Sequence, residues 1–191
     1  MKKNEIAYYP EITRFIGSQL QSNLRVEGVD DVYIYWKNGE LTSGLKELLR
    51  EHPVECGCLA EYSRITPPLN LDIFGVVTNG IKFEIVILEI KLKDAVGLNE
   101  WSQLIGYNLV SDAKYGLLIN IDAGASERLT RILSFDEDAS RIIRKRKNGT
   151  MVEHLLGFMQ WNSVTQNFEY SNMGQISSLS SLSSILIEQF I

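Results

Sequence analysis

The spacing of apolar residues predicts four helices in the first 135 residues. The first, "PEITRFIGSQLQSNL", repeats apolar side chains every three or four positions and begins with Pro10, a residue favoured in the first helical turn. The other three show the same period, and Asn99 is the candidate N-cap of the third. The four predicted ranges are 10–24, 41–52, 98–114 and 125–135.

Runs of β-branched and aromatic residues predict strands between these helices. The clearest pair is "LNLDIFGVV" and "KFEIVILEIKL", and the "TNG" that separates them predicts a hairpin. "YGLLINI" is typical of a short buried strand. Two further strands are expected over 31–36, before a turn at Asn38-Gly39, and over 54–62. Helices and strands in this order predict an α/β domain with a mixed sheet.

The pattern is weaker beyond about residue 148. Additional strands are expected in "MVEHLLGFMQW" and "NFEY". The tail, "ISSLSSLSSILIEQFI", predicts a helix that docks either on its own domain or on a second copy of the chain. We therefore expect one domain over residues 1–191, with its core at about 8–135 and a C-terminal extension at about 148–191.

Composition narrows the class of protein. A hydrophobic fraction of 45% is enough for a sizeable core, and no apolar run approaches the roughly 20 residues that cross a bilayer. The first residues lack the apolar segment of a secretory signal. The expectation is a soluble cytoplasmic protein with no membrane partner.

Two features of the sequence, a pair of cysteines and a basic run, would be functional only if further ligands or a nucleic-acid site lay nearby. Cys56 and Cys58 are too few for a zinc or iron–sulfur site and poorly placed for a disulfide, so buried reduced thiols are expected. The net charge is −5, yet "RIIRKRK" gathers five cations in seven residues. This run is either a solvated helix end or loop, or a set of phosphate contacts if a nucleic-acid site exists elsewhere.

The most informative stretch is "KFEIVILEIK". Successive side chains of a strand point to opposite faces, so Glu89 and Lys91 continue a row of apolar residues on one face. Burial of charged groups is unfavourable unless they have partners. The two residues therefore either form a structural ion pair at the strand end or belong to a site with a third group.

Asp72 is the candidate third group. It lies among apolar residues on the preceding strand, and a turn centred near residue 79 places it roughly opposite Glu89. Two carboxylates this close repel each other unless a cation lies between them. Carboxylate oxygens suit Mg²⁺ or Mn²⁺, and Lys91 beside the ion could orient water or stabilise charge.

Asp72 in "NLDIFG" and Glu89-Ile90-Lys91 in "LEIK", followed by a helix, resemble the PD-(D/E)XK nuclease superfamily over about residues 8–121. The resemblance implies a restriction-endonuclease-like core of order αβββαβ, in which a mixed central sheet is flanked by helices. No proline directly precedes Asp72, in contrast to the family pattern, and the four-cysteine cluster of some RecB-type members is absent.

Three further residues extend the resemblance. Gln103 and Tyr107 in "WSQLIGY" are similar to the Q-x-x-x-Y of the RecB-type branch, and their spacing places them on one helical face. Tyr107 either contacts nucleic acid or packs in the core. Glu11 resembles an acidic residue that many members carry as a metal ligand, although the helix dipole alone also favours an acid there.

The resemblance implies a metal-dependent nuclease, and we expect a small DNA endonuclease. Mg²⁺ or Mn²⁺ would be held by Asp72, Glu89, the carbonyl of Ile90 and Glu11, while Lys91 and Gln103 complete the catalytic set with the two carboxylates. The expected nucleic-acid contacts are Tyr107, Arg141, Arg144, Lys145, Arg146 and Lys147. The alternatives are a catalytically silent interaction module, a structural hairpin ion pair, and a dimeric junction resolvase; DNA and RNA both stay open as substrates.

Overall fold

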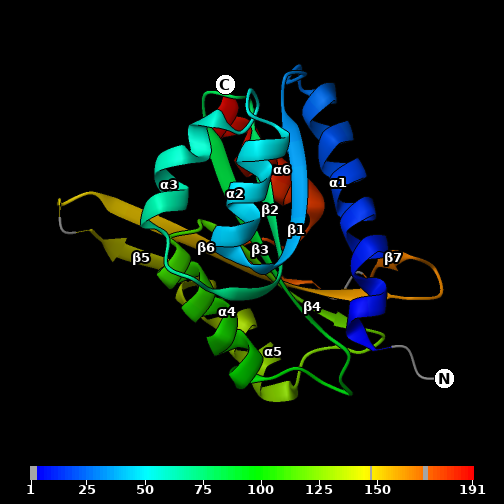
Figure 1. Ribbon diagram of the computed structural model, residues 1–191. Coiled ribbons are helices and arrows are strands. Elements are labelled where there is room, and N and C mark those ends of the chain that lie inside the picture. The colour runs from blue at the N-terminus through cyan, green and yellow to red at the C-terminus, as the bar shows by residue number, and fades with distance from the viewer. Residues whose placement is uncertain (1–3, 147, 170–171) are drawn as a thin grey trace.

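A computed structural model describes residues 4–146, 148–169 and 172–191. In this part of the chain, eight strands form one mixed sheet that is flanked by helices, which confirms the predicted α/β class (Figure 1). The helices are α1 (Tyr9–Val26), α2 (Leu41–Glu51), α3 (Ala60–Ile65), α4 (Leu98–Ser111), α5 (Glu127–Phe135) and α6 (Leu179–Phe190), with short 3-10 helices η1 (Glu5–Tyr8), η2 (Gly57–Leu59) and η3 (Glu137–Ser140). The strands are β1 (Tyr33–Glu40), β2 (Asn70–Thr78), β3 (Phe83–Lys91), β4 (Tyr115–Ile121), β5 (Arg141–Lys145), β6 (Met151–Asn162), β7 (Asn167–Phe168) and β8 (Met173–Gly174).

The sheet has the strand order β1-β2-β3-β4-β6-β5, and the short strands β7 and β8 also pair with β6. β1, β2 and β3 run antiparallel, whereas β4 is parallel to both β3 and β6. The hairpin predicted from "TNG" is therefore confirmed, and a helical crossover through α4 joins its second strand to β4.

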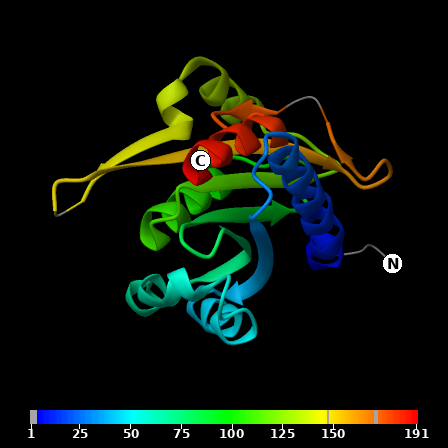
Figure 2. The same ribbon diagram turned by 90° about the horizontal axis from the view of Figure 1, so that it is seen from above.

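Each face of the sheet buries its own apolar cluster. One cluster packs beneath α1 and α6, which lie side by side in Figure 2, and includes Leu20, Leu182 and Leu186. The other packs beneath α2, α4 and α5. The C-terminal helix thus docks on its own domain, and Leu182 and Leu186 are fully buried there. Among the described helices, none combines the length and the apolar character that crossing a membrane requires.

Residues 54–62 correct the sequence prediction of a strand: 54–56 form a turn, 57–59 form η2, and 60–62 begin α3. The buried side chains here are Cys56, Leu59 and Ser63, which are spaced three and four residues apart. This spacing is helical, so the prediction of a strand in "VECGCLAEY" is wrong.

Two smaller predictions are also corrected. Asn38-Gly39 does not end β1, because the strand continues to Glu40 through a β-bulge in which Gly39 adopts a φ of +90°. The N-cap of α4 is Gly97 instead of Asn99, and the Glu100 carboxylate accepts a hydrogen bond from the Gly97 N–H at 2.8 Å. The predicted strand "NFEY" is β7 over its first two residues, and Tyr170 lies outside the described residues.

Candidate active site on the β2–β3 hairpin

The register of the hairpin places Asp72 beside Glu89. Ile73 pairs with Leu88 at the end of the β2–β3 ladder, so one further residue brings Asp72 opposite Glu89. The β1–β2 ladder shifts register at the same point, where it passes over Asp72 and Ile73. The sheet therefore opens on one side of Asp72 while the hairpin holds it on the other.

Lys91 joins the two carboxylates. Its Nζ lies 3.0 Å from Asp72 Oδ2 and 2.6 Å from Glu89 Oε1. The backbone N–H of Ile90 also donates to Asp72 Oδ2, at 3.0 Å. The structure thus brings together Asp72, Glu89 and Lys91, which we call the trio.

Burial makes the trio electrostatically unusual. The Glu89 side chain is 1% exposed, and its Oε2 has no hydrogen-bond partner among the described residues. Burial raises the pKa of Glu89, Lys91 opposes this effect, and the charge of Asp72 adds to it. Burial also disfavours the charged form of Lys91, but hydrogen bonds and attraction from Glu89 and Asp72 outweigh this and raise its pKa.

Charge counting shows what the trio lacks. When ionised, two carboxylates and one ammonium group leave one negative charge uncompensated, and Glu5 adds a further negative influence on Glu89. A buried carboxylate oxygen without a partner is costly. An additional cation would satisfy both the charge and the oxygen.

Tyr9 belongs to this site although the sequence did not identify it. It is buried at the start of α1, and burial, followed by the charge and hydrogen bonding of Asp72, raises its pKa. Glu5 lies in η1, outside the apolar repeat that predicted the helix. A tyrosine directly before Pro10 carries no pattern that would indicate contact with a strand 63 residues away, so only the fold reveals it.

Glu11 faces elsewhere. Its Oε1 accepts a hydrogen bond from Trp161 Nε1 at 3.0 Å, and its Oε2 accepts one from Gln166 Nε2 at 3.1 Å. Both carboxylate oxygens are thus engaged by β6 and the loop after it. The structure does not bring Glu11 to the trio through any hydrogen bond or ion pair in the described part of the chain.

Gln103 and Tyr107 contact each other on α4. Gln103 Nε2 donates to the Tyr107 hydroxyl at 2.6 Å, and the Tyr107 ring packs against the core beneath α4. Over the described ranges, no hydrogen bond or ion pair links either residue to the trio. α4 begins shortly after β3 ends, so its first turns lie at the same end of the sheet as Lys91.

The basic run lies at the opposite end of the sheet. Its first five residues, Arg141–Lys145, form the edge strand β5, and Arg146 follows the strand. β5 pairs with the first residues of β6 in an arm that projects from the body (Figure 1). Glu89 on β3 pairs with Leu118 on β4, which in turn pairs with Phe158 on β6. Lys145 pairs with Met151, which is the first residue of β6. The run is therefore remote from the trio.

Three cations of the run already have partners. Arg141 pairs with Glu153, Arg146 with Asp112, and Arg144 donates to the Leu109 carbonyl at 2.6 Å. The contacts of Arg144 and Arg146 fall on the C-terminal end of α4, where positive charge stabilises a helix. Lys147 lies outside the described residues.

The donors of the trio fit a divalent cation. Among the described residues no group of three or more His, Cys, Asp or Glu side chains forms a metal cluster, so the protein would supply two carboxylates, with a backbone carbonyl and water to complete the shell. Hard oxygen donors of this kind suit Mg²⁺ or Mn²⁺.

Cys56 and Cys58 are free, and burial raises the pKa of Cys56 to about 11, so its thiol is inert.

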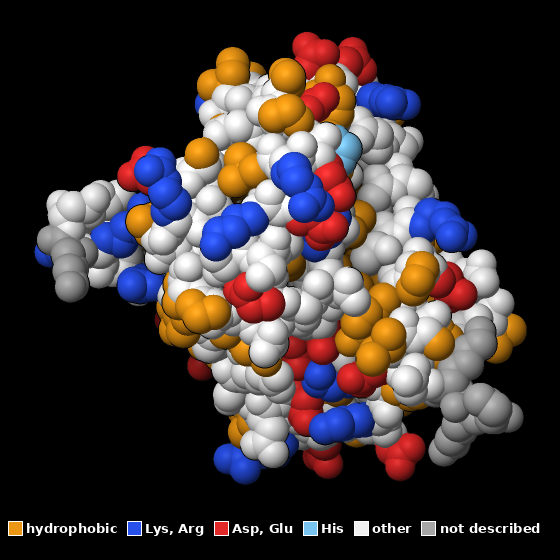
Figure 3. Space-filling view, viewed as in Figure 1, with side chains coloured by type: hydrophobic (Ala, Val, Ile, Leu, Met, Phe, Trp, Pro, Cys, Tyr) orange, Lys and Arg blue, Asp and Glu red, His pale blue; other side chains and the backbone are white. Residues whose placement is uncertain are grey.

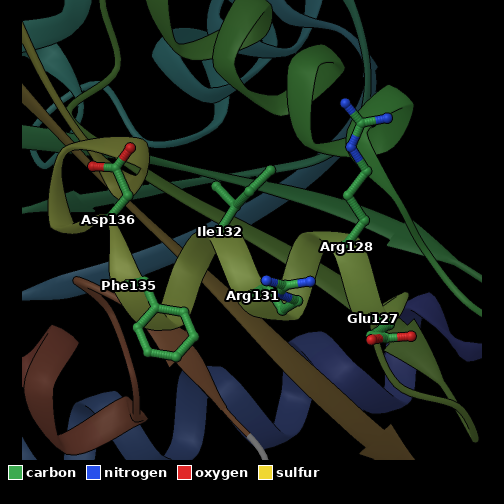
Figure 4. A pocket seen from close by; sticks show the side chains of 6 residues that line it. All are labelled: Glu127, Arg128, Arg131, Ile132, Phe135 and Asp136. Atoms are coloured by element: carbon green, nitrogen blue, oxygen red, sulfur yellow. The ribbon is translucent and has the colours of Figure 1, made fainter.

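A hollow of about 610 Å³ lies along α5 and the residue after it (Figure 4). Its lining includes Arg128 and Arg131, one turn apart, beside Ile132 and the exposed Phe135. A bridge between Val96 and Ala125 ties the start of α5 to the loop after β3, so these arginines belong to the end of the sheet that carries the trio. Figure 3 shows charges of both signs interspersed on the face that it views.

Comparison with known proteins gives no assignment: no protein-family model, curated protein or solved structure matches this chain. The function is therefore argued from the trio, its burial and its unsatisfied oxygen.

Proposed function

We propose that this protein is a metal-dependent nuclease of the PD-(D/E)XK type that hydrolyses phosphodiester bonds in DNA. The observation that carries the proposal is the meeting of Asp72, Glu89 and Lys91 across the hairpin, with one buried Glu89 oxygen left without a partner. The order α1, β1, β2, β3, α4, β4 is the αβββαβ order that such a core requires, with α2 and α3 inserted between β1 and β2.

Each member of the trio has a defined role in this proposal. Asp72 and Glu89, with the carbonyl of Ile90, would hold Mg²⁺ or Mn²⁺. The chemistry that such an ion supplies when bound is activation of water and neutralisation of charge on the phosphoryl group. Lys91 orients the attacking water and offsets charge on the phosphate, since its ammonium group is fixed by both carboxylates. Gln103 positions water or the strand.

The surroundings agree with a polynucleotide substrate in one respect. Arg128 and Arg131 on α5, at the trio's end of the sheet, are exposed and can contact phosphates. A net charge of −5 disfavours a broadly basic resolvase surface, so a small endonuclease is the form that we propose. A homodimer is compatible with this proposal but is not needed to complete the trio.

A cleavage assay with matched variants tests the proposal. Purified protein is incubated with Mg²⁺ or Mn²⁺ and with supercoiled DNA, linear duplex, single strands, a four-way junction and RNA. We expect cleavage of DNA that EDTA abolishes, and a loss of about 10²-fold or more in Glu89→Gln and Lys91→Met.

Glu84→Gln is the matched control. Glu84 is also a glutamate on β3 that pairs with a lysine, Lys114, and its side chain is 11% exposed, but it lies at the far end of the strand. Wild-type rates in Glu84→Gln alongside loss in Glu89→Gln support the proposal. No cleavage of any substrate by the wild type, or full activity in Glu89→Gln, overturns it. Cleavage confined to the four-way junction would select the resolvase form, and cleavage confined to RNA would exclude DNA.

A further inference from the structure

The break in the β1–β2 ladder opens the sheet next to Asp72. Lys37 pairs with Phe74 and Gly39 pairs with Leu71, so Asn38 on one strand and Asp72 and Ile73 on the other are left out of the register. Gly39 permits this with its φ of +90°. Bulges of this kind redirect side chains and are frequent next to active sites.

A pocket of about 170 Å³ lies at this opening, between α1 and β1. Tyr9 connects it to the trio, because the tyrosine lines the pocket and lies near enough to Asp72 for this carboxylate to raise its pKa. The lining residues are Tyr9, Pro10, Thr13, Trp36, Lys37, Asn38 and Ile73. The volume suits one small group adjacent to the reacting centre.

The fold keeps the aromatic wall of this pocket in place. A Cβ on Gly75 would lie 2.4 Å from the Trp36 ring, and one on Gly17 would lie 3.0 Å from its Nε1, so the indole occupies space that only glycines leave free. Trp36 Nε1 is buried and has no hydrogen-bond partner among the described residues. A ring clamped in this way is preorganised for stacking.

The polar groups of the pocket favour a neutral ligand. No acidic side chain is among its lining residues, and the Lys37 ammonium is bound to Glu47 at 3.0 Å and Glu51 at 3.1 Å. The pocket therefore offers no free cation for a phosphate. It offers aromatic and apolar walls and the side-chain amide of Asn38, which lies outside the ladder. It also offers the Thr13 hydroxyl oxygen as an acceptor, because this hydroxyl donates its proton to the Tyr9 carbonyl at 2.8 Å.

We propose that this pocket receives one nucleobase of the strand whose phosphate lies at the trio. The inference rests on the proposed function and adds a base-binding subsite to it. A base presents a planar face to the aromatic wall and hydrogen-bonding edges to the amide and hydroxyl, while its sugar-phosphate leads toward Asp72. The enzyme therefore requires a base, and not only a backbone, beside the bond that it cleaves.

Abasic substitution tests the subsite. A set of fluorescent single-stranded oligonucleotides carries one abasic position that is moved along the sequence. Binding is measured by anisotropy with EDTA, and cleavage is measured separately with Mn²⁺. For the wild type we expect one abasic position, next to the cleaved bond, to weaken binding about 10-fold.

Two variants fill the pocket: Thr13→Phe on α1 and Asn38→Phe, at an exposed position outside the ladder. Both should bind the intact oligonucleotide as weakly as the wild type binds the abasic one, and both should lose the dependence on the base. Ser18→Phe is the matched control, because it adds the same ring at an exposed position of α1 outside the pocket and should keep that dependence. Using two filling variants allows for the failure of either one to fold.

The outcomes distinguish a failure of the proposed base-binding subsite from a failure of the proposed phosphodiester hydrolysis. Equal affinity of the wild type for intact and abasic strands overturns the subsite, whether or not DNA is cleaved. Base-dependent binding that survives in a folded filling variant overturns it as well. Base-dependent binding that both filling variants lose, without cleavage by the wild type, supports the subsite and overturns hydrolysis.

Discussion

Glu89 is the residue on which the proposed chemistry depends. A carboxylate that is 1% exposed, with one oxygen lacking a partner, lowers the stability of the free protein. A purely structural ion pair would satisfy both oxygens with donors. Retaining such a group is typical of functional sites, where residues break the rules that optimise stability elsewhere.

Replacing Lys91 should therefore destabilise the protein much more than replacing Glu89. Lys91→Met should destabilise the metal-free protein by roughly 3 kcal/mol, because two carboxylates are left without their cation. Glu89→Gln should lower the free energy of unfolding far less, because Lys91 still pairs with Asp72 and the excess negative charge is removed. Urea unfolding in EDTA near pH 7.5 measures both. A Glu89→Gln variant less stable than Lys91→Met would contradict this account of the charges.

Side-chain alternation was sufficient to predict the trio, because period two along a hairpin fixes which residues meet. It was insufficient for Glu11, Tyr9 and Glu5. Their positions depend on how α1 crosses the sheet, which no local pattern encodes. Glu11 has the helix position that the family resemblance implies, yet Trp161 and Gln166, both distant in sequence, hold its carboxylate.

At the scale of elements, the end of β1 and the start of α2 are coupled by one residue. Glu40 is the N-cap of α2, and its carboxylate accepts hydrogen bonds from the Thr42 and Ser43 N–H groups at 2.8 Å each. The Ser43 hydroxyl and these N–H groups lower the pKa of Glu40 to about 2. The helix therefore starts immediately where the strand stops.

Replacing Glu40 should have an effect that depends on pH. Glu40→Gln should lower the free energy of unfolding by about 1 kcal/mol at pH 7. Because the folded-state pKa is lower than the unfolded value of about 4.3, this contribution is complete above the unfolded value. It should disappear as the pH falls toward 2. Urea unfolding of both proteins at pH 7, 4 and 2.5 measures the difference.

Glu61→Gln, in the first turn of α3, is the control for this prediction and should change stability by less than about 0.5 kcal/mol. A Glu40→Gln deficit that stays constant across the pH range would show that the carboxylate charge is not what stabilises α2.

Helix and strand identity followed from the sequence wherever a period ran for many residues. All four predicted helices, the hairpin and the buried strand β4 are present. The errors fall where signals are short. Cys56, Leu59 and Ser63 span only about two helical turns, and Asn38-Gly39 fits a bulge as well as a turn. Sheet order could not be predicted, because pairing between distant strands leaves no local mark.

At the scale of the whole molecule, the trio and the basic run lie at opposite ends of the sheet. From the level of Phe158 to Met151, β6 covers roughly 23 Å at 3.3 Å per residue. A duplex rises 3.4 Å per base pair, so about seven base pairs separate the two sites. Both can contact one duplex only when the duplex is longer than this.

The separation predicts an effect of substrate length. Lys145→Gln should weaken binding of a duplex of about 20 base pairs. It should also reduce the salt dependence, because each lost phosphate contact lowers the slope of log affinity against log salt concentration by roughly one unit. It should leave binding of a duplex of about six base pairs unchanged. Anisotropy titrations at several salt concentrations measure this. An equal loss for both lengths would place Lys145 near the trio's substrate and contradict the separation.

Titration calorimetry with Mn²⁺ tests the central claim, that the trio is a divalent-cation site. The account predicts saturable binding to the wild type, at least a 10-fold weaker affinity in Glu89→Gln, and wild-type affinity in Glu84→Gln, which alters a similar ion pair at the other end of β3. No binding heat for the wild type at several temperatures, or identical binding by Glu89→Gln, would contradict it.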